Sequence, residues 1–232
     1  MSKWLVITGG SRGIGAKTIQ HFLDNGYHAV NISRTASDIA TENLTLDLSK
    51  PATFSQMSEK LSALLKNATQ VCLVHNAAVY QVDTIGEIDA SKWQTILDVN
   101  ITAPIMLNNI LIPFMPKGSA IIYIGSTLSE LAVANRASYV ITKHAMIGMM
   151  RSTTQDLAAK GIHSCCICPG FVNTDMALQE VDRNAFNAFI AEKVIAKRLI
   201  EPSEIAELIY FSATHPVING SVLHANLGQV TS

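Results

Sequence analysis

The amino-acid sequence predicts an α/β fold in which a doubly wound parallel sheet carries helices on both faces. Short runs of β-forming residues alternate along the chain with stretches of helical periodicity, which is the pattern of repeated strand-helix-strand units. Residues 71–74 and 120–124 are continuous apolar runs, as expected for strands that are covered on both faces. No repeat, linker or low-complexity tract interrupts the alternation, so we expect a single domain over residues 1–232.

The expected strands, about seven in number, share a high content of β-branched and other apolar residues. They cover residues 4–7, 28–32, 43–46, 71–75, 120–124, 163–168 and 222–224. The expected helices between them share apolar residues at helical spacing. They cover residues 14–25, 52–66, 91–112, 139–160 and 202–212.

Two connections depart from this alternation. The crossover over residues 33–43 is too short and too polar for a full helix. Residues 173–200 form a long insertion after the sixth expected strand. Long insertions near the carboxyl ends of strands often carry substrate contacts, so we expect residues 173–200 to cover the substrate.

Composition and charge exclude several classes of protein. Hydrophobic residues make up 48% of the chain and charged residues 15%, whereas a disordered chain needs low hydrophobicity and high charge. The net charge of −1 gives no global field that would attract nucleic acid or an anionic membrane. No run of about 18 apolar residues is present, so we expect no membrane-spanning segment. The N-terminal apolar run is too short for a signal peptide, which predicts a cytoplasmic protein.

The four cysteines indicate burial rather than a metal site. Cys165, Cys166 and Cys168 share one apolar stretch, and Cys72 lies in another. A zinc site would need a second cluster at loop spacing, which the sequence lacks. We therefore expect buried thiols in a reducing compartment and no bound metal.

A glycine-rich turn, residues 8–15, follows the first expected strand and opens a helix. The unpaired amides and the positive end of such a helix bind phosphate, and glycines let a pyrophosphate approach the backbone. The spacing of Gly9, Gly13 and Gly15 makes the turn about one residue longer than the GxGxxG form. The turn therefore predicts a dinucleotide site with contacts from Gly9, Ser11, Arg12, Gly13, Ile14 and Gly15.

The residue types at the end of the second expected strand indicate whether the protein binds NAD or NADP(H). An acidic residue there would bind the ribose hydroxyl of NAD, but this sequence has Ser33 and Arg34. Guanidinium groups bind phosphate through paired hydrogen bonds, so Arg34, together with Arg12, suits the 2′-phosphate of NADP(H). A solvated loop charge is the alternative interpretation of Arg34.

Tyr139 and Lys143 are four residues apart at the start of an expected helix and so share one helical face. A phenol titrates near pH 10 and shuttles protons poorly at neutral pH unless a cation favours its anion. We expect Lys143 to supply that charge and to make the phenol of Tyr139 more acidic. Tyr139 would then donate a proton to a carbonyl oxygen as hydride reaches the carbon.

Two further polar residues extend this constellation. Ser126 follows the strand expected over residues 120–124, where its hydroxyl would hydrogen-bond the developing oxyanion. Asn100 lies inside an apolar helical pattern, where an amide needs a partner. Its role stays open between a structural hydrogen bond and a held water that relays protons.

Several motifs, in register from residue 8 to beyond residue 220, together resemble the short-chain dehydrogenase/reductase family. They are the turn over residues 8–15, Asp47, Asn76-Ala77-Ala78, Asn100, Ser126, Tyr139, Lys143 and the stretch over residues 169–174. The resemblance implies a Rossmann-like fold and a catalytic tetrad of Asn100, Ser126, Tyr139 and Lys143. It departs at His75 and Ala78, where the family's usual Asn-Asn-Ala-Gly run has Asn and Gly.

The same resemblance implies contacts to NADP(H) outside the glycine turn. Asp47 would bind the adenine, Lys143 would hold the nicotinamide ribose, and Val172 and Thr174 would contact the nicotinamide end. The implied contacts are Ser33, Arg34, Asp47, Leu48, Asn76, Ala77, Ala78, Tyr139, Lys143, Pro169, Gly170, Val172 and Thr174.

Within the family, residues 169–176, 198–206 and 219–224 resemble 3-oxoacyl carrier-protein reductases. This implies NADPH-dependent reduction of a ketone, with a 3-oxoacyl thioester as a candidate substrate and an acyl carrier protein as a candidate partner. The candidate basic patch for that partner is Arg183, Lys193, Lys197 and Arg198, and a solvated helix face is the alternative that explains these charges equally well. The family also implies a homodimer or homotetramer formed through the helices 91–112 and 139–160.

Two alternative functions stay open. The same residues would also oxidise a secondary alcohol, and a binding protein could sense NADP(H) without turnover. Four apolar residues either line a substrate pocket or pack in the core: Phe171, Met176, Phe186 and Phe189. His75, at the end of a buried strand, is expected to satisfy a backbone hydrogen bond rather than to catalyse.

Overall fold

The computed structural model describes residues 2–50, 53–175 and 183–230. Seven parallel strands form one sheet in the order β3-β2-β1-β4-β5-β6-β7, which confirms the predicted α/β architecture. The strands are β1 (Ser2–Thr8), β2 (Tyr27–Ser33), β3 (Glu42–Thr45), β4 (Ala68–His75), β5 (Ala120–Ile124), β6 (His163–Pro169) and β7 (Val222–Ala225). After β3 the chain crosses back to pair β4 with the other side of β1. The crevice at the carboxyl ends of β1 and β4 is the switch point at which such sheets bind ligands.

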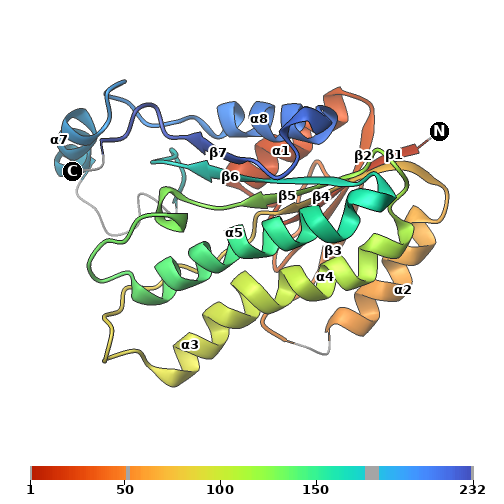
Figure 1. The fold of residues 1–232 in the computed structure, drawn as a ribbon, viewed down its shortest axis with the longest axis horizontal. Helices are drawn as coiled ribbons and strands as arrows, with labels where there is room; N and C mark the ends of the chain where they lie inside the picture. Colours follow the sequence, from red (N-terminus) through yellow and green to blue (C-terminus); the bar gives the residue numbers. More distant parts are fainter. Residues whose placement is uncertain (1, 51–52, 176–182, 231–232) are drawn as a thin grey trace.

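Helices cover both faces of the sheet (Figure 1). Helices α1 (Gly13–Asp24) and α8 (Pro202–Thr214) lie on one face, and α2 (Thr53–Leu65), α4 (Ala103–Leu111) and α5 (Ala137–Leu157) lie on the other. Helix α3 (Ala90–Leu97) precedes α4, and α7 (Arg183–Lys193) lies beyond the end of the sheet. The placement of helices on both faces explains why the central strands are apolar on both sides.

Alternate strand residues build two separate cores. In β1, Val6 packs with the residues under α2, α4 and α5, whereas Leu5 and Ile7 pack with those under α1 and α8. This division follows from the period of two residues along a strand. All four cysteines are buried in β4 or β6 and carry free thiols, as the sequence predicted.

The helix expected over residues 91–112 is not continuous. A π-helical segment, Asp98–Thr102, separates α3 from α4. Single-turn π segments inside α-helices are frequent at functional sites, and this one contains the buried Asn100. Helical periodicity alone does not reveal such a segment, because one inserted residue barely disturbs the apolar pattern.

By length and composition alone, the helical stretch Ala90–Phe114 would be able to cross a membrane. Core helices of globular proteins meet the same criterion, and here α3 packs against α5 while α4 packs against α2. The absence of a membrane-spanning segment stays a prediction.

The two irregular connections differ in what the structure describes. Between β2 and β3 there is no helix, as predicted, and the side chain of Asn43 closes the connection by hydrogen bonds with the backbone of Ser37. The insertion over residues 173–200 contains α7, and its ends meet in a bridge between Val172 and Ile200. Residues 176–182 of the insertion, including Met176, lie outside the described residues, and its covering role stays a prediction.

Candidate active site

The glycine turn lies at the carboxyl end of β1, folded tightly onto the start of α1. Gly9 has a φ of +69°, a conformation that side chains disfavour, and a Cβ there would lie 3.1 Å from Ala77 Cα. A Cβ on Gly15 would lie 2.1 Å from the carbonyl oxygen of Gly9. The side chain of Arg12, the N-cap residue of α1, makes no capping hydrogen bond within the described structure. The shape of this backbone turn therefore fits a phosphate group, and its role in binding a nucleotide stays a prediction.

Asn31, which the sequence analysis missed, holds this turn in place. Its side-chain oxygen accepts a hydrogen bond from the Gly10 amide at 2.9 Å. Its amide nitrogen donates to Thr35 O at 3.1 Å and to Asn43 Oδ1 at 2.9 Å. One buried side chain thus joins the glycine turn to the connection that follows β2. The available signal was a lone amide inside an apolar strand.

Asn76 and Ala77 lie beside the glycine turn. The hydroxyl of Thr8 accepts hydrogen bonds from the amides of Asn76 and Ala77 at 3.0 and 2.9 Å. The Asn76 side chain donates to the carbonyl oxygens of Thr8 and Gly9, each at 3.0 Å. These contacts join the carboxyl ends of β1 and β4. Thr174 closes the opposite side, because a Cβ on Gly13 would lie 3.2 Å from its methyl group.

At the end of β2, Arg34 is exposed and Ser33 is buried with its hydroxyl donating to Thr35 O. Hydrogen bonds from the backbone and side chain of Ser49 hold the pKa of Asp47 below its usual value, with a smaller contribution from Arg34. Asp47 and Arg34 therefore share one region, as expected of the adenine end. Leu48 lies in the hydrophobic core, so its side chain is buried and is not accessible to a nucleotide.

Arg12 makes an ion pair that the sequence does not predict. Its guanidinium pairs with Asp175 at 3.2 Å, and both side chains are largely exposed. The sequence placed Arg12 at a phosphate because of its position in the glycine turn. The pairing with a residue far along the chain depends on how the start of the insertion folds back, which the local sequence does not show.

Tyr139, Lys143 and Ser126 come together at the carboxyl end of β5. Tyr139 is 9% exposed and Lys143 is 2% exposed. The ammonium of Lys143 lies 5.4 Å from the centre of the Tyr139 ring and donates a hydrogen bond to Ile124 O at 2.7 Å. The Tyr139 phenol interacts with the side chain of Ser126. The helical spacing of Tyr139 and Lys143 therefore places both side chains where the sequence predicted.

The acidity of Tyr139 is opposite to the expectation. Burial raises the pKa of Tyr139 to about 12, and the hydrogen bond from Ser126 only partly offsets this effect. Burial also lowers the pKa of Lys143 to about 8, because a buried ammonium is less stable than its neutral form. The phenol is thus held protonated over the whole neutral range. That state suits a proton donor, and Lys143 is the group of the pair that titrates near neutrality.

This difference predicts how ketone reduction depends on pH. Lys143 is charged below a pKa of about 8 and loses its charge as the pH rises through that value. We expect kcat for reduction to be level below about pH 7.5 and to fall above pH 8. In K143R the guanidinium keeps its charge, so the activity should be lower but without this fall. An equally steep fall in K143R would exclude Lys143 as its cause.

Ser126 is held by the short 3-10 helix Thr127–Ser129 that follows β5. Its hydroxyl accepts a hydrogen bond from the Leu128 amide at 3.1 Å, and its own amide donates to Ser129 Oγ at 3.1 Å. The hydroxyl proton of Ser126 is therefore free to turn toward Tyr139 or a substrate oxygen.

Both polar atoms of the Asn100 side chain form hydrogen bonds with other residues of the protein. Its oxygen accepts from the Val79 amide at 2.8 Å, and its nitrogen donates to Val79 O at 3.0 Å and to Thr142 Oγ1 at 3.1 Å. Both amide protons are therefore used, which favours the structural alternative for this side chain. Asn100 joins the segment after β4 to the helix that carries Tyr139.

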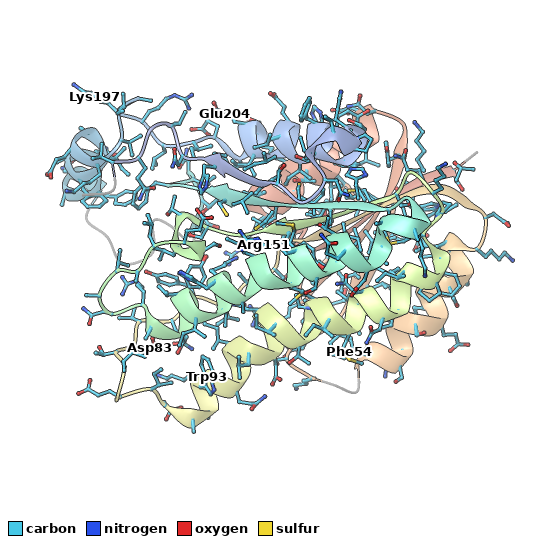
Figure 2. The ribbon with its side chains drawn as sticks, viewed as in Figure 1. Phe54, Asp83, Trp93, Arg151, Lys197 and Glu204 are labelled. Carbon is cyan, nitrogen blue, oxygen red and sulfur yellow. The ribbon has the colours of Figure 1, made fainter. Side chains whose placement is uncertain are left out.

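Asp83 is a second residue that the sequence analysis missed. Its carboxylate accepts hydrogen bonds from the amide of Ser138, at 2.9 Å, and from the Ser138 hydroxyl. Figure 2 labels Asp83 beside the first turn of α5. A carboxylate at this position accepts a hydrogen bond from an amide that has no partner within the helix. Its negative charge also interacts favourably with the positive N-terminal end of the helix dipole. Asp83 thus fixes the helical turn from which Tyr139 projects.

Other candidate residues lie in different settings. His75 bonds the side chain of Asn108 at 2.8 Å rather than the backbone, and burial lowers its pKa to about 4. The packing of α4, which carries Asn108, against the end of β4 supplies that partner, and the sequence does not show this packing. The rings of Phe171, Phe186 and Phe189 contact one another edge-on or stacked, and Phe189 is exposed.

The candidate basic patch is partly neutralised. Arg198 pairs with Glu204 at 2.6 Å, and Lys193 lies 3.2 Å from Glu192. Lys197 is exposed, while the side chain of Arg183 lies outside the described structure. The charge available to an acidic partner is therefore smaller than the sequence suggests.

Comparisons with known proteins agree with this geometry. Residues 3–185 match the family model "short chain dehydrogenase". The chain is 28% identical over 247 residues to the 3-oxoacyl-[acyl-carrier-protein] reductase FabG of Vibrio cholerae, covering 98% of this chain and 97% of that one. A solved short chain dehydrogenase family protein from Francisella tularensis superposes with a TM-score of 0.85 at 26% identity, covering 98% of both chains. A blue fluorescent protein from a metagenomic library, solved with NADPH, superposes with a TM-score of 0.88 at 27% identity, covering 99% of this chain and 98% of that one.

Proposed function

Because the chain belongs to the short-chain dehydrogenase family, whose members are oxidoreductases that use a nicotinamide nucleotide, we propose that it is an NADPH-dependent enzyme reducing a ketone to a secondary alcohol. The observation that carries the proposal is the buried Tyr139 beside Lys143 and Ser126, at the carboxyl end of β5. Strands from residue 2 to residue 225 form one sheet, so we propose that residues 1–232 act as one nucleotide-binding domain.

The residues present fit the nucleotide. The glycine turn and the start of α1 would hold its pyrophosphate, Asp47 its adenine, and Asn76 and Ala77 its middle part. Pro169 ends β6, and Gly170, Val172 and Thr174 follow it. These four residues would flank the nicotinamide, with Lys143 at its ribose. When bound, the nucleotide supplies the hydride that reduces the carbonyl carbon.

The side chains near β5 would handle the oxygen of the substrate. Ser126 would donate a hydrogen bond to the carbonyl oxygen and stabilise the negative charge that develops on it. Tyr139, kept protonated by burial, would give its proton to that oxygen. The Lys143 ammonium would stabilise the phenolate that is left. Reversal of these steps would oxidise an alcohol with the same residues.

The positive charge of the residue that follows β2 supports tighter binding of NADPH than of NADH. Arg34 is exposed there, and no acidic residue stands in the strand or the next four positions. We expect NADPH to bind at least about tenfold more tightly than NADH, and Arg34→Ala to narrow that ratio. Titration of both nucleotides into wild type and R34A measures the ratio of the two affinities, and the distant surface variant K66A is the control. Equal affinities in wild type would contradict the preference.

The candidate substrate is a 3-oxoacyl thioester, on the likeness to a reductase of that name. An acyl carrier protein would be its carrier, and a homodimer or homotetramer in the cytoplasm is the proposed assembly.

The decisive experiment follows NADPH oxidation with a panel of ketones that includes 3-oxoacyl thioesters. Turnover lost in Y139F supports the enzyme, whereas NADPH binding without turnover of any ketone would favour a non-catalytic sensor. Light scattering tests the assembly.

A further inference from the structure

Arg136 lies directly before α5, three positions before Tyr139. Its guanidinium lies 5.0 Å from the centre of the Tyr80 ring. The Tyr80 ring in turn meets the Tyr139 ring edge-on at 5.1 Å. Two successive ring contacts thus connect the guanidinium to the phenol. Tyr80 is 38% exposed, whereas Tyr139 is 9% exposed, so the arginine and the outer ring border the solvent side of the phenol.

The backbone around Arg136 is fixed rather than loose. Asp83 forms a bridge with Arg136, through the amide of Asp83 donating to Asn135 O and the amide of Ala137 donating to Asp83 O, each at 3.3 Å. The side chain of Thr84 also donates to Asn135 Oδ1 at 3.1 Å. These contacts hold the arginine in place before any ligand binds, which reduces the entropy lost on binding.

The guanidinium of Arg136 forms no ion pair with a carboxylate in the described parts of the chain. In the described structure its guanidinium makes one hydrogen bond, from Nη1 to Asn135 O at 2.6 Å. In the described parts of the chain, no carboxylate lies within 4.0 Å of its guanidinium. The nearby Asp83 carboxylate accepts both of its hydrogen bonds from Ser138. The remaining guanidinium donors are therefore available, and a guanidinium pairs best with a planar or tetrahedral oxyanion.

We propose that Arg136 selects a substrate that carries an anionic group, a carboxylate or a phosphate, beside the ketone that Tyr139 protonates. This inference rests on the proposed function, because it places the reacting carbonyl at Tyr139 and Ser126. Tyr80 holds the guanidinium by a cation–π contact, and the same ring touches the ring of Tyr139. Arg136 is thus a specificity-determining residue, and neutral ketones are poorer substrates.

The test compares matched charged and neutral ketones in wild type, R136Q, R136K and the control R151Q. Arg151 is an exposed arginine on the same helix (Figure 2), about 22 Å along its axis from residue 136. One pair of ketones is 3-oxobutanoate and its methyl ester. The other is the 3-oxobutanoyl thioester of coenzyme A and that of N-acetylcysteamine, which lacks phosphate. The pair that responds distinguishes a carboxylate from a phosphate.

In R136Q we expect kcat/KM for the responding anionic ketone to fall about 10- to 100-fold, mainly through KM. The matching neutral ketone should change by less than about threefold, R136K should recover part of the loss, and R151Q should resemble wild type. Equal losses for charged and neutral ketones, or no loss for either, would refute the proposal.

A binding measurement separates this proposal from the proposed function. With NADPH present, 3-hydroxybutyrate cannot react, so its equilibrium binding and that of its methyl ester can be compared in wild type and R136Q. A preference for the acid that disappears in R136Q supports the anion site. Failure of wild type to bind NADPH refutes the proposed function. NADPH binding with equal affinities for the acid and the ester, together with no response to R136Q in the coenzyme A pair, refutes only the role of Arg136.

Discussion

Replacing Tyr139 by phenylalanine should reduce kcat for ketone reduction at least about 1000-fold while leaving the fold intact. The phenol is the proton donor of the proposed reaction, and burial with a raised pKa of about 12 keeps it protonated at neutral pH. Phenylalanine retains the buried ring and its edge contact with Tyr80, so the free energy of unfolding should change by about 1 kcal/mol or less. Steady-state kinetics, nucleotide titration and thermal unfolding measure the three quantities.

Tyr210 offers a matched control for Y139F. It lies on α8, on the opposite face of the sheet, where its ring meets Phe22 edge-on. Y210F removes the same hydroxyl group and should keep full activity. If Y139F kept more than about a tenth of the wild-type rate with NADPH still bound, another group would have to donate the proton, and the proposed mechanism would fail.

Gly15→Ala should disrupt both nucleotide binding and stability. The added Cβ would lie 2.1 Å from Gly9 O and 2.8 Å from Gly10 Cα, and backbone atoms cannot move aside as a flexible side chain can. We expect the free energy of unfolding to fall by at least about 2 kcal/mol, despite the better helix propensity of alanine. Affinity for NADPH should fall about 100-fold or more, because the turn that cradles the phosphate must open.

Gly148→Ala is the matched control for G15A. Gly148 lies inside α5, and a Cβ there would meet no atom within 4 Å among the described residues outside the neighbouring backbone of the helix. Alanine should therefore stabilise the protein by about 0.5–1 kcal/mol and leave NADPH affinity unchanged. Denaturant unfolding and fluorescence titration of both variants measure the contrast. Loss of stability in both variants, or in neither, would show that contact at the turn is not what requires Gly15.

Much of the candidate site could be predicted because its signals are local. Tyr139 and Lys143 share a helical face by their spacing, and the glycine turn directly follows a strand. Asn31 and Asp83 could not be found in this way. Their partners, Gly10 and Ser138, lie in other segments of the chain and meet them only in the folded protein.

The alternation of apolar runs by itself determined the seven strands, most of the helices between them and the edge of the sheet where the candidate site lies, because periodicity is a property of short segments. Only the tertiary structure decided the acidity of Tyr139 and the pairing of Arg12. Burial, set by neighbours from distant segments, outweighs the hydrogen bond from Ser126 and raises the pKa of the phenol. The ion pair of Arg12 with Asp175 likewise depends on how the chain after β6 returns to the glycine turn.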